Sequence, residues 1–163
     1  MVTPTLHMFC GKIASGKSTL ATQVASQGAV LIVEDDWLRA LFADQMKTGA
    51  DYLRCSGRLR SVMGAHVTSL LNAGMSVSLD FAANTIDQRR WMRGILDDTT
   101  AAHQLHVLDT PDDDCLTRLS ARNAAGEHPF TVSEEQFQRF SNSFVRPAAE
   151  EGFNLVVHCP NAS

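Results

Sequence analysis

Long apolar runs are absent from this chain of 163 residues. No stretch approaches the ~18 consecutive apolar residues that a membrane-spanning helix needs. The N-terminal "MVTPTLHMFCGK" lacks the charged start and long apolar stretch of a signal peptide. Internal repeats, linkers and low-complexity segments are also missing. We therefore expect a single cytoplasmic domain over residues 1–163, a length that is sufficient to bury a hydrophobic core.

Closely spaced cysteines are missing as well. Cys10, Cys55, Cys115 and Cys159 lie far apart, and no Cys-x-x-Cys pair or Cys/His zinc-ligand spacing occurs. Their spacing favours free thiols in a reducing compartment. Basic residues are not in excess, because 14 Lys and Arg against 18 Asp and Glu leave a formal net charge of −4. This balance counts against a protein that binds nucleic acid without sequence preference.

Short apolar runs alternate with amphipathic helical patterns along the chain. Several of the runs are apolar throughout, as buried parallel strands are. Two of the helical segments have capping-box spacing at their starts, Thr85 with Gln88 and Ser133 with Gln136. The alternation predicts an α/β fold in which a parallel sheet carries helices on both faces. The predicted strands are residues 6–10, 29–33, 76–81, 104–109 and 153–158.

The pattern Gly-x-x-x-x-Gly-Lys-Ser occupies residues 11–18, directly after the first apolar run. This Walker A pattern lets a glycine-rich backbone wrap around a phosphate chain at the N-terminus of a helix. Lys17 then reaches the β- and γ-phosphates, and the Ser18 hydroxyl becomes a ligand of Mg²⁺. No Asn is followed by Lys, so the Asn-Lys-x-Asp element of GTPases is absent and ATP is favoured. The predicted ATP-binding residues are Gly11, Ala14, Ser15, Gly16, Lys17, Ser18 and Thr19.

Two adjacent carboxylates, Asp35 and Asp36, follow the second apolar run. Ligands of open α/β sheets bind at the carboxyl edge of the strands, so this pair should face the same crevice as the phosphate loop. We expect Asp36 to accept the proton of an attacking hydroxyl, and Asp35 to cap the next helix or to bind the substrate. Arg39, one helical turn after Asp36, can steer a polar or anionic acceptor. Alternatively, Asp36 only complements the helix dipole.

Asp80 ends the third apolar run, where a carboxylate can hold Mg²⁺ directly or through water. Its alternative role is that of a turn residue at the end of a strand. Arg118 and Arg122 are four residues apart and share one helix face. With the polar segment that follows, they predict a lid near residues 118–133 that excludes water and places arginine on the transferring phosphate. Alternatively, both arginines are solvated.

Three further features have less specific interpretations. His66 lies on the apolar stripe of a predicted helix, and we expect it to be packed in the core. The first basic cluster consists of Arg54, Arg58 and Arg60, and the second consists of Arg89, Arg90 and Arg93. Each cluster is either a solvated helix face or part of a groove for a phosphorylated or polynucleotide acceptor.

The Walker A loop is followed in order by "DDWLR", "SVSLDFAANTIDQRRW", "LTRLSAR" and "RFSNSFVRPAAEEGF". This order resembles the small P-loop kinases and phosphotransferases related to the kinase domain of polynucleotide 5'-kinase, to chloramphenicol phosphotransferase, and to zeta-toxin-like and gluconate kinases. The resemblance covers nearly the whole chain. It implies a P-loop NTPase fold like that of nucleoside-monophosphate kinases, with five parallel strands in the order 2-3-1-4-5.

The resemblance also implies roles for particular residues. Asp36 and Arg39 match an Asp-x-x-Arg pair that supplies the base and an acceptor-binding arginine in polynucleotide kinases. The lid arginines 118 and 122 match a pair that contacts the transferring phosphate. Arg146 and Pro147 match a segment near the adenine.

Together these features favour an ATP-dependent kinase that transfers the γ-phosphoryl group to an alcohol group of a small-molecule acceptor. A 5'-hydroxyl polynucleotide kinase is the alternative within the same fold. The acidic net charge counts against it, as does Glu34, which stands where many relatives have Ser or Asn. A nucleotide-binding regulatory module that transfers no phosphate is an alternative of another class. The presence of Asp36, Arg118 and Arg122 argues against such a module.

Overall fold

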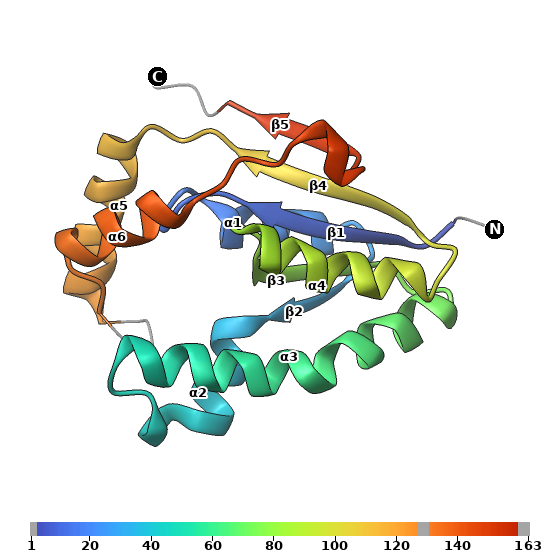
Figure 1. Ribbon diagram of the computed structural model, residues 1–163, viewed down its shortest axis with the longest axis horizontal. Coiled ribbons are helices and arrows are strands. Elements are labelled where there is room, and N and C mark those ends of the chain that lie inside the picture. Colours follow the sequence, from blue (N-terminus) through green and yellow to red (C-terminus); the bar gives the residue numbers. More distant parts are fainter. Residues whose placement is uncertain (1–2, 127–130, 160–163) are drawn as a thin grey trace.

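Five strands form one all-parallel sheet in the order β2-β3-β1-β4-β5 (Figure 1). The computed structural model describes residues 3–126 and 131–159. It confirms the predicted α/β fold and the strand order that the family resemblance implies. The strands are β1 (Thr5–Cys10), β2 (Val30–Val33), β3 (Val77–Ala82), β4 (Ala102–Leu108) and β5 (Leu155–His158).

Helices connect the strands, and three of them begin at capping boxes. The boxes that start at Thr85 and Ser133 were predicted from their spacing, and a third starts at Thr48. The α-helices are α1 (Lys17–Ala25), α2 (Glu34–Phe42), α3 (Gly49–Asn72), α4 (Ile86–Asp97), α5 (Asp112–Ala125) and α6 (Glu134–Ser143). Short 3₁₀ turns occupy Ala43–Gln45 and Ala149–Glu151. No described helix is both long and apolar enough to cross a membrane.

The side chains of β3 alternate between two layers of helices. On one face, the Ser78 hydroxyl donates a hydrogen bond of 2.8 Å to the carbonyl oxygen of Ala21 in α1. On the other face, Val77 and Leu79 join the main core, to which α3 and α4 contribute apolar side chains. Successive strand residues point to opposite faces, so α1 covers one side of the sheet and α3 and α4 cover the other (Figure 1).

The long helix α3 buries a stripe of residues along one side. Burial of each large apolar side chain contributes about 1.5–3 kcal/mol. His66 is exposed, so the expectation of a core histidine is wrong. Neighbouring helix residues point about 100° apart, and position 66 is turned away from the buried Val67 beside it. The buried apolar stripe consists of Cys55, Leu59, Met63, Val67 and Leu71.

One arginine of the second basic cluster lies in the interior. Arg89 is only 1% exposed. Its Nε and Nη2 atoms donate to the Glu151 carboxylate at 2.7 and 3.2 Å, and Nη1 donates to the Ala83 carbonyl at 2.9 Å. A solvated face is therefore the wrong interpretation for this residue. Arg89 instead ties α4 to the last 3₁₀ turn and to the end of β3.

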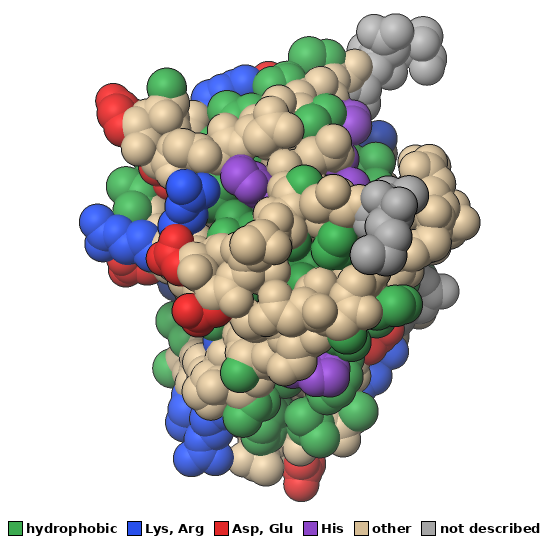
Figure 2. All heavy atoms as spheres, turned by 90° about the vertical axis from the view of Figure 1, so that its right-hand side faces the viewer, with side chains coloured by type: hydrophobic (Ala, Val, Ile, Leu, Met, Phe, Trp, Pro, Cys, Tyr) green, Lys and Arg blue, Asp and Glu red, His purple; other side chains and the backbone are tan. Residues whose placement is uncertain are grey.

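The carboxyl ends of the five strands point to the same end of the molecule, where α5 and α6 lie (Figure 1). The opposite end is shown in Figure 2, where Lys and Arg side chains are interspersed with Asp and Glu. The visible surface there carries no continuous basic band. The loops that could form a ligand site therefore gather at the carboxyl end of the sheet, as the sequence predicts.

Candidate functional site

The loop between β1 and α1 has the backbone of a phosphate cradle. Ala14 and Gly16 have positive φ values of 62° and 103°, and such turns aim backbone N–H groups into one concavity. At Gly11 an added Cβ would clash with the Ser15 hydroxyl oxygen, so a side chain there would displace neighbouring atoms. That buried hydroxyl has no hydrogen-bond partner among the described residues. The loop therefore fits a bound phosphate chain.

Two neighbouring strands hold this loop in place. The Gly11 N–H donates to Oδ1 of Asn84, beyond the end of β3, at 2.9 Å. The Thr110 hydroxyl, beyond the end of β4, donates to the Ser15 carbonyl at 2.7 Å. No motif in the sequence assigns a role to Asn84 or Thr110. Each of the two residues follows an apolar strand closely, and this position predicts that it lies at the carboxyl edge of the sheet, where the phosphate loop lies.

Lys17, the first residue of α1, is folded into the loop. Its Nζ donates to the carbonyl oxygens of Gly11 and Lys12, the second at 3.0 Å. Burial lowers the pKa of the Lys17 ammonium, and the nearby Asp80 carboxylate partly opposes that change. The charge is thus held by backbone groups at the place where the phosphate oxygens of a nucleotide would arrive.

Ser18 and Asp80 lie beside Lys17 and are joined to each other. The Ser18 hydroxyl donates to Oδ2 of Asp80 at 2.7 Å. Burial raises the pKa of Asp80, against the opposing effects of this hydrogen bond and of the Lys17 charge. No cluster of three His, Cys, Asp or Glu residues suited to a metal occurs within 3–126 and 131–159. Mg²⁺ commonly takes one or two protein oxygens together with substrate phosphates, and the Ser18–Asp80 pair fits that arrangement.

The two adjacent carboxylates after β2 have different surroundings. Helix α2 begins at Glu34 with Val33 in the cap position, so the prediction that Asp35 caps the helix is wrong. Asp35 lines the same cavity as the phosphate loop, whereas Asp36 is exposed and is not part of the lining. Burial and the charge of Asp80 raise the pKa of Asp35. The geometry thus favours Asp35 over Asp36 as the carboxylate that faces the loop.

Both predicted lid arginines line the cavity from α5. The Nη1 atom of Arg118 lies 3.3 Å from the position that a Cβ on Gly16 would take. Arg122 is half-buried, and its Nε atom has no hydrogen-bond partner in the described part of the chain. Burial lowers the pKa of Arg122, and the charge of Asp35 opposes this. Residues 127–130 of the predicted lid lie outside the described residues.

Two other predicted contact residues lie outside this cavity. Arg39 is exposed and does not line it. Arg146 lines a neighbouring cavity of about 340 Å³. There its Nη1 and Nη2 atoms donate to the Asp109 carboxylate at 2.7 and 2.9 Å, which lowers the pKa of Asp109. The structure therefore does not bring Arg39 to the main cavity, whereas Arg146 shares its cavity with Lys12 of the phosphate loop, and its place near the adenine stays a prediction.

The main cavity has a volume of about 940 Å³ and extends to both sides of the central strand β1. We name its two halves by the strands that contain their lining residues or that precede those residues in the chain. The β2–β3 half consists of Glu34, Asp35, Tyr52, Leu53, Asp80, Ala82, Asn84, Thr85 and Gln88. The β4–β5 half consists of Leu108, Arg118, Arg122, Val132, Phe140, Ser143 and His158. Among these described lining residues, the β2–β3 half has carboxylates and no Lys or Arg, whereas the β4–β5 half has two arginines and no carboxylate.

Comparisons with known proteins agree with this architecture. A family model described as "AAA domain" matches residues 6–147. Among solved structures, the Mycobacterium tuberculosis APS kinase CysC in complex with AMPPNP and APS is 23% identical with a TM-score of 0.68, and the match covers 100% of this chain and 92% of that one. A Janibacter sugar kinase is 17% identical with a TM-score of 0.66, and the match covers 97% and 86%.

A chain of the Pnkp1/Rnl/Hen1 RNA repair complex is 20% identical with a TM-score of 0.62, and the match covers 88% of this chain and 44% of that one. Among curated proteins, no sequence matches. The family model spans most of the chain, from β1 to beyond α6, and so includes the phosphate loop, the acidic pair and the lid arginines. The chain therefore belongs to the P-loop kinase family that this AAA domain describes.

Proposed function

We propose that this protein transfers the γ-phosphoryl group of ATP to an alcohol group of a small molecule. The observation that carries the proposal is the convergence of Asp35, the Ser18–Asp80 pair and Arg122 on one cavity around the phosphate loop. Phosphoryl transfer needs these groups, because its catalysis consists mainly of positioning and charge stabilisation. The complex of the M. tuberculosis APS kinase with AMPPNP and APS supports a nucleotide and an acceptor in one such site.

The phosphate loop and α1 hold the donor in this proposal. The loop amides and Lys17 bind the β- and γ-phosphates at the helix N-terminus. Ser18 and Asp80 would hold Mg²⁺, which would supply charge neutralisation on the phosphate oxygens. Burial lowers the pKa of Lys17, and the charge of Asp80 opposes that change and so favours the cationic form. The donor is thereby fixed with its γ-phosphate directed to the acceptor.

Asp35 takes the proton in the transfer step. As the acceptor oxygen forms its bond to the γ-phosphorus, the bond from that phosphorus to the β–γ bridging oxygen breaks and ADP leaves. The proton of the attacking hydroxyl passes to Asp35, and Arg118 and Arg122 stabilise the charge on the transferring group. A base works best when its pKa lies near the working pH, and burial raises the pKa of Asp35 in that direction.

A screen of acceptors with Mg-ATP tests the proposal. ADP release above the acceptor-free background is measured with nucleosides, sugars, aminoglycosides, chloramphenicol-like antibiotics and oligonucleotides. At least one acceptor is expected to raise the rate. ATP binding by calorimetry without turnover of any acceptor would instead identify a regulatory nucleotide-binding module.

The adjacent isosteric variants Asp35→Asn and Asp36→Asn test the base. Asp35→Asn should lower acceptor-dependent turnover by ~10²- to 10⁴-fold, the usual contribution of a positioned base, and leave ATP affinity nearly unchanged. Asp36→Asn is the matched control and should stay active, because Asp36 lies outside the lining. If Asp36→Asn is inactive and Asp35→Asn is not, the base is Asp36. The acidic limb of the kcat–pH profile should lie above the ordinary Asp pKa.

A further inference from the structure

Asn84 of the β2–β3 half lies next to the phosphate loop. Its Oδ1 atom accepts from the backbone N–H of Gly11 at 2.9 Å, at the start of that loop. The carbonyl oxygen of the same Gly11 accepts from Nζ of Lys17. The two side chains therefore hold neighbouring groups of one residue, and Asn84 lies beside the place from which the Lys17 ammonium reaches the β- and γ-phosphates.

The hydrogen bond to Gly11 fixes which way the Asn84 amide is turned. A backbone N–H is a donor, so only the oxygen of the amide can pair with it. The NH₂ group then remains as the donor of a residue that lines the cavity. Asn84 therefore uses one end of its side chain to hold the phosphate loop and keeps the other end for a ligand.

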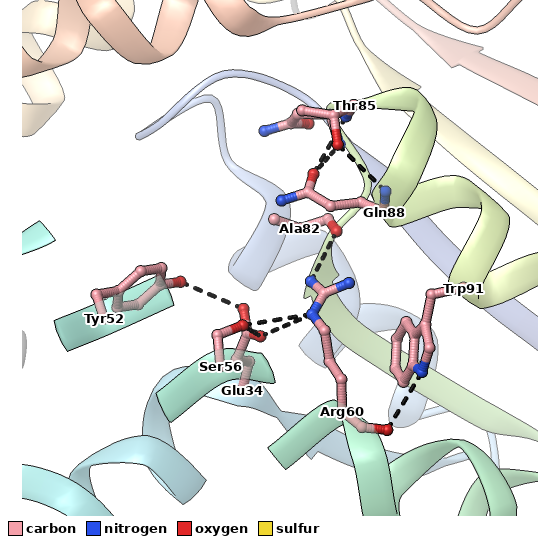
Figure 3. Close-up of polar contacts among 9 residues, drawn as sticks. Glu34, Tyr52, Ser56, Arg60, Ala82, Thr85, Gln88 and Trp91 are labelled. Atoms are coloured by element: carbon pink, nitrogen blue, oxygen red, sulfur yellow. Dashed lines mark hydrogen bonds and ion pairs between the residues drawn. The ribbon is translucent and has the colours of Figure 1, made fainter. Parts of the chain in front are cut away.

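The backbone of Asn84 is held from two further sides. Its N–H donates to Oε1 of Gln88 at 2.8 Å, beside the capping box that Thr85 and Gln88 form at the start of α4 (Figure 3). Its carbonyl oxygen accepts from the N–H of Val145 at 2.8 Å, in the segment that follows α6. Asn84 thus joins the phosphate loop, α4 and the segment after α6.

The two alanines that precede Asn84 are fixed in a similar way. Nη2 of Arg60 donates to the carbonyl oxygen of the first at 3.1 Å (Figure 3), and Nη1 of Arg89 donates to that of the second at 2.9 Å. Arg60 is itself paired with the buried Glu34, with 3.4 Å between Nε and Oε2. A donor on such a rigid segment can stabilise developing charge at one fixed point without reorganisation.

We propose that Asn84 is a further catalytic residue, whose NH₂ group donates a hydrogen bond to the γ-phosphoryl group as it is transferred. This inference rests on the proposed function. The amide oxygen stays on the phosphate loop, so the donor keeps its place relative to the bound phosphates. Charge is spread over the oxygens of the transferring group, and this donor stabilises it from the β2–β3 half while the arginines act from the β4–β5 half.

Calorimetry with AMPPNP and ADP tests the inference without an acceptor, because only AMPPNP has a γ-phosphate. Asn84→Ala should weaken AMPPNP binding by ~10-fold or more beyond its effect on ADP, the scale of a hydrogen bond to a charged group. Loss of the loop contact alone would weaken both nucleotides alike. Thr110→Val is the matched control, since it removes a hydrogen bond to the same loop from the β4 side and should affect both nucleotides equally. An unchanged ratio of the two affinities in Asn84→Ala overturns the inference.

Asn84→Asp separates the two ends of the side chain. The isosteric carboxylate can still accept from Gly11, so the loop and the fold should be retained, which thermal unfolding checks. It has no NH₂ group and carries a negative charge, so AMPPNP affinity should fall further than in Asn84→Ala, with a smaller loss for ADP. Equal losses for the two nucleotides would place this end of the side chain away from the γ-phosphate and overturn the inference.

Turnover of an acceptor found in the screen gives the second readout. Asn84→Ala and Asn84→Asp should lower kcat by ~10²-fold with little change in the KM of the acceptor, and Thr110→Val should lower kcat much less. Wild-type kcat in Asn84→Ala overturns the inference and leaves the proposed function standing. If the wild type turns over no acceptor, the proposed function fails, and the ratio of AMPPNP to ADP affinity still decides whether Asn84 meets the γ-phosphate.

Discussion

Arg122, which lines the cavity, and Arg60, which lies behind it, are held in different ways. Arg122, in the β4–β5 half, comes from α5, which packs through a small separate cluster of Cys115, Leu119, Val132 and Phe137. Its Nε atom has no hydrogen-bond partner among the described residues. Arg60, behind the β2–β3 half, comes from α3 in the main core, and its guanidinium is paired and stacked.

This difference separates charges that can act on a ligand from charges that stabilise the fold. A cation can stabilise a transferring phosphate only if its hydrogen-bonding groups remain available for the transition state. Segments that pack through fewer buried contacts open more easily, so the small cluster under α5 suits a lid. The main core around α3 suits a rigid β2–β3 half of the cavity. The following four changes test this contrast, from the largest expected effect to the smallest.

Lys17→Ala should have the largest effect, because it removes the charge between the β- and γ-phosphates. Acceptor-dependent transfer should fall to the background, and ATP binding should weaken in calorimetry. The fold should remain, since the ammonium contacts loop carbonyls rather than the core. Lys12→Ala is the matched control in the same loop, because that side chain pairs with Asp112 at 2.9 Å. Wild-type activity in Lys17→Ala would contradict the assignment of the phosphate loop.

Arg122→Ala should lower kcat by ~10³-fold, the lower range for an arginine that stabilises a phosphoryl transition state. ATP affinity should change much less, because a lid arginine makes its best contacts when the site is closed. Arg118→Ala should act in the same direction. Arg139→Ala on α6 is the control, since Arg139 is exposed and pairs with Glu135 at 2.9 Å. Unchanged kcat in both lid variants would make these residues solvated surface arginines.

Glu34→Gln should disturb the β2–β3 half of the cavity and destabilise the fold. Removing one partner of a buried ion pair leaves Arg60 uncompensated, at a cost of about 3 kcal/mol. Tm should fall by about 6–12 °C, and the KM of the acceptor should rise while ATP affinity is retained. Asp51→Asn is the control, because its pair with Arg54 is exposed and contributes little. Unchanged Tm and KM in Glu34→Gln would show that the Glu34–Arg60 pair does not support the β2–β3 half of the cavity.

His106 should give the smallest effect, a change in the pH dependence of stability. Its Nε2 lies 3.1 Å from Nδ1 of His7, and its Nδ1 lies 3.0 Å from Nε2 of His158, which lines the β4–β5 half. Burial, with the charges of His7 and His158, lowers the pKa of His106 from 6.5 to about 4. The unfolded chain therefore takes up a proton near pH 6.5 that the folded chain takes up only near pH 4.

Stability should accordingly fall as the pH drops from 6.5 to 4, and this fall should be smaller in His106→Phe. Chemical unfolding at several pH values measures it. His66→Phe, at an exposed position, is the control. A variant that keeps the full pH dependence would place its origin in other groups.

Much of the fold could be predicted because its signals are local. The strands were recognised from short apolar runs, and the starts of α4 and α6 from capping boxes that span four residues. The phosphate loop was recognised because its glycines and lysine are consecutive in the chain. Arg118 and Arg122 were correctly paired, because a spacing of four places two residues on one helix face.

The sequence by itself determined the α/β class, the phosphate loop and the set of polar residues from which the site is built, because local patterns specify local backbone. Only the tertiary structure decided which of those residues face the cavity. Asp35 and Asp36 are neighbours in sequence, but adjacent helix residues point about 100° apart, so the first residue of α2 decides which one enters the site. Arg60 and Arg89 looked like surface charges because their carboxylate partners, Glu34 and Glu151, lie far away in the chain. Folding brings these partners together, and a buried charge is stable only where such a partner meets it.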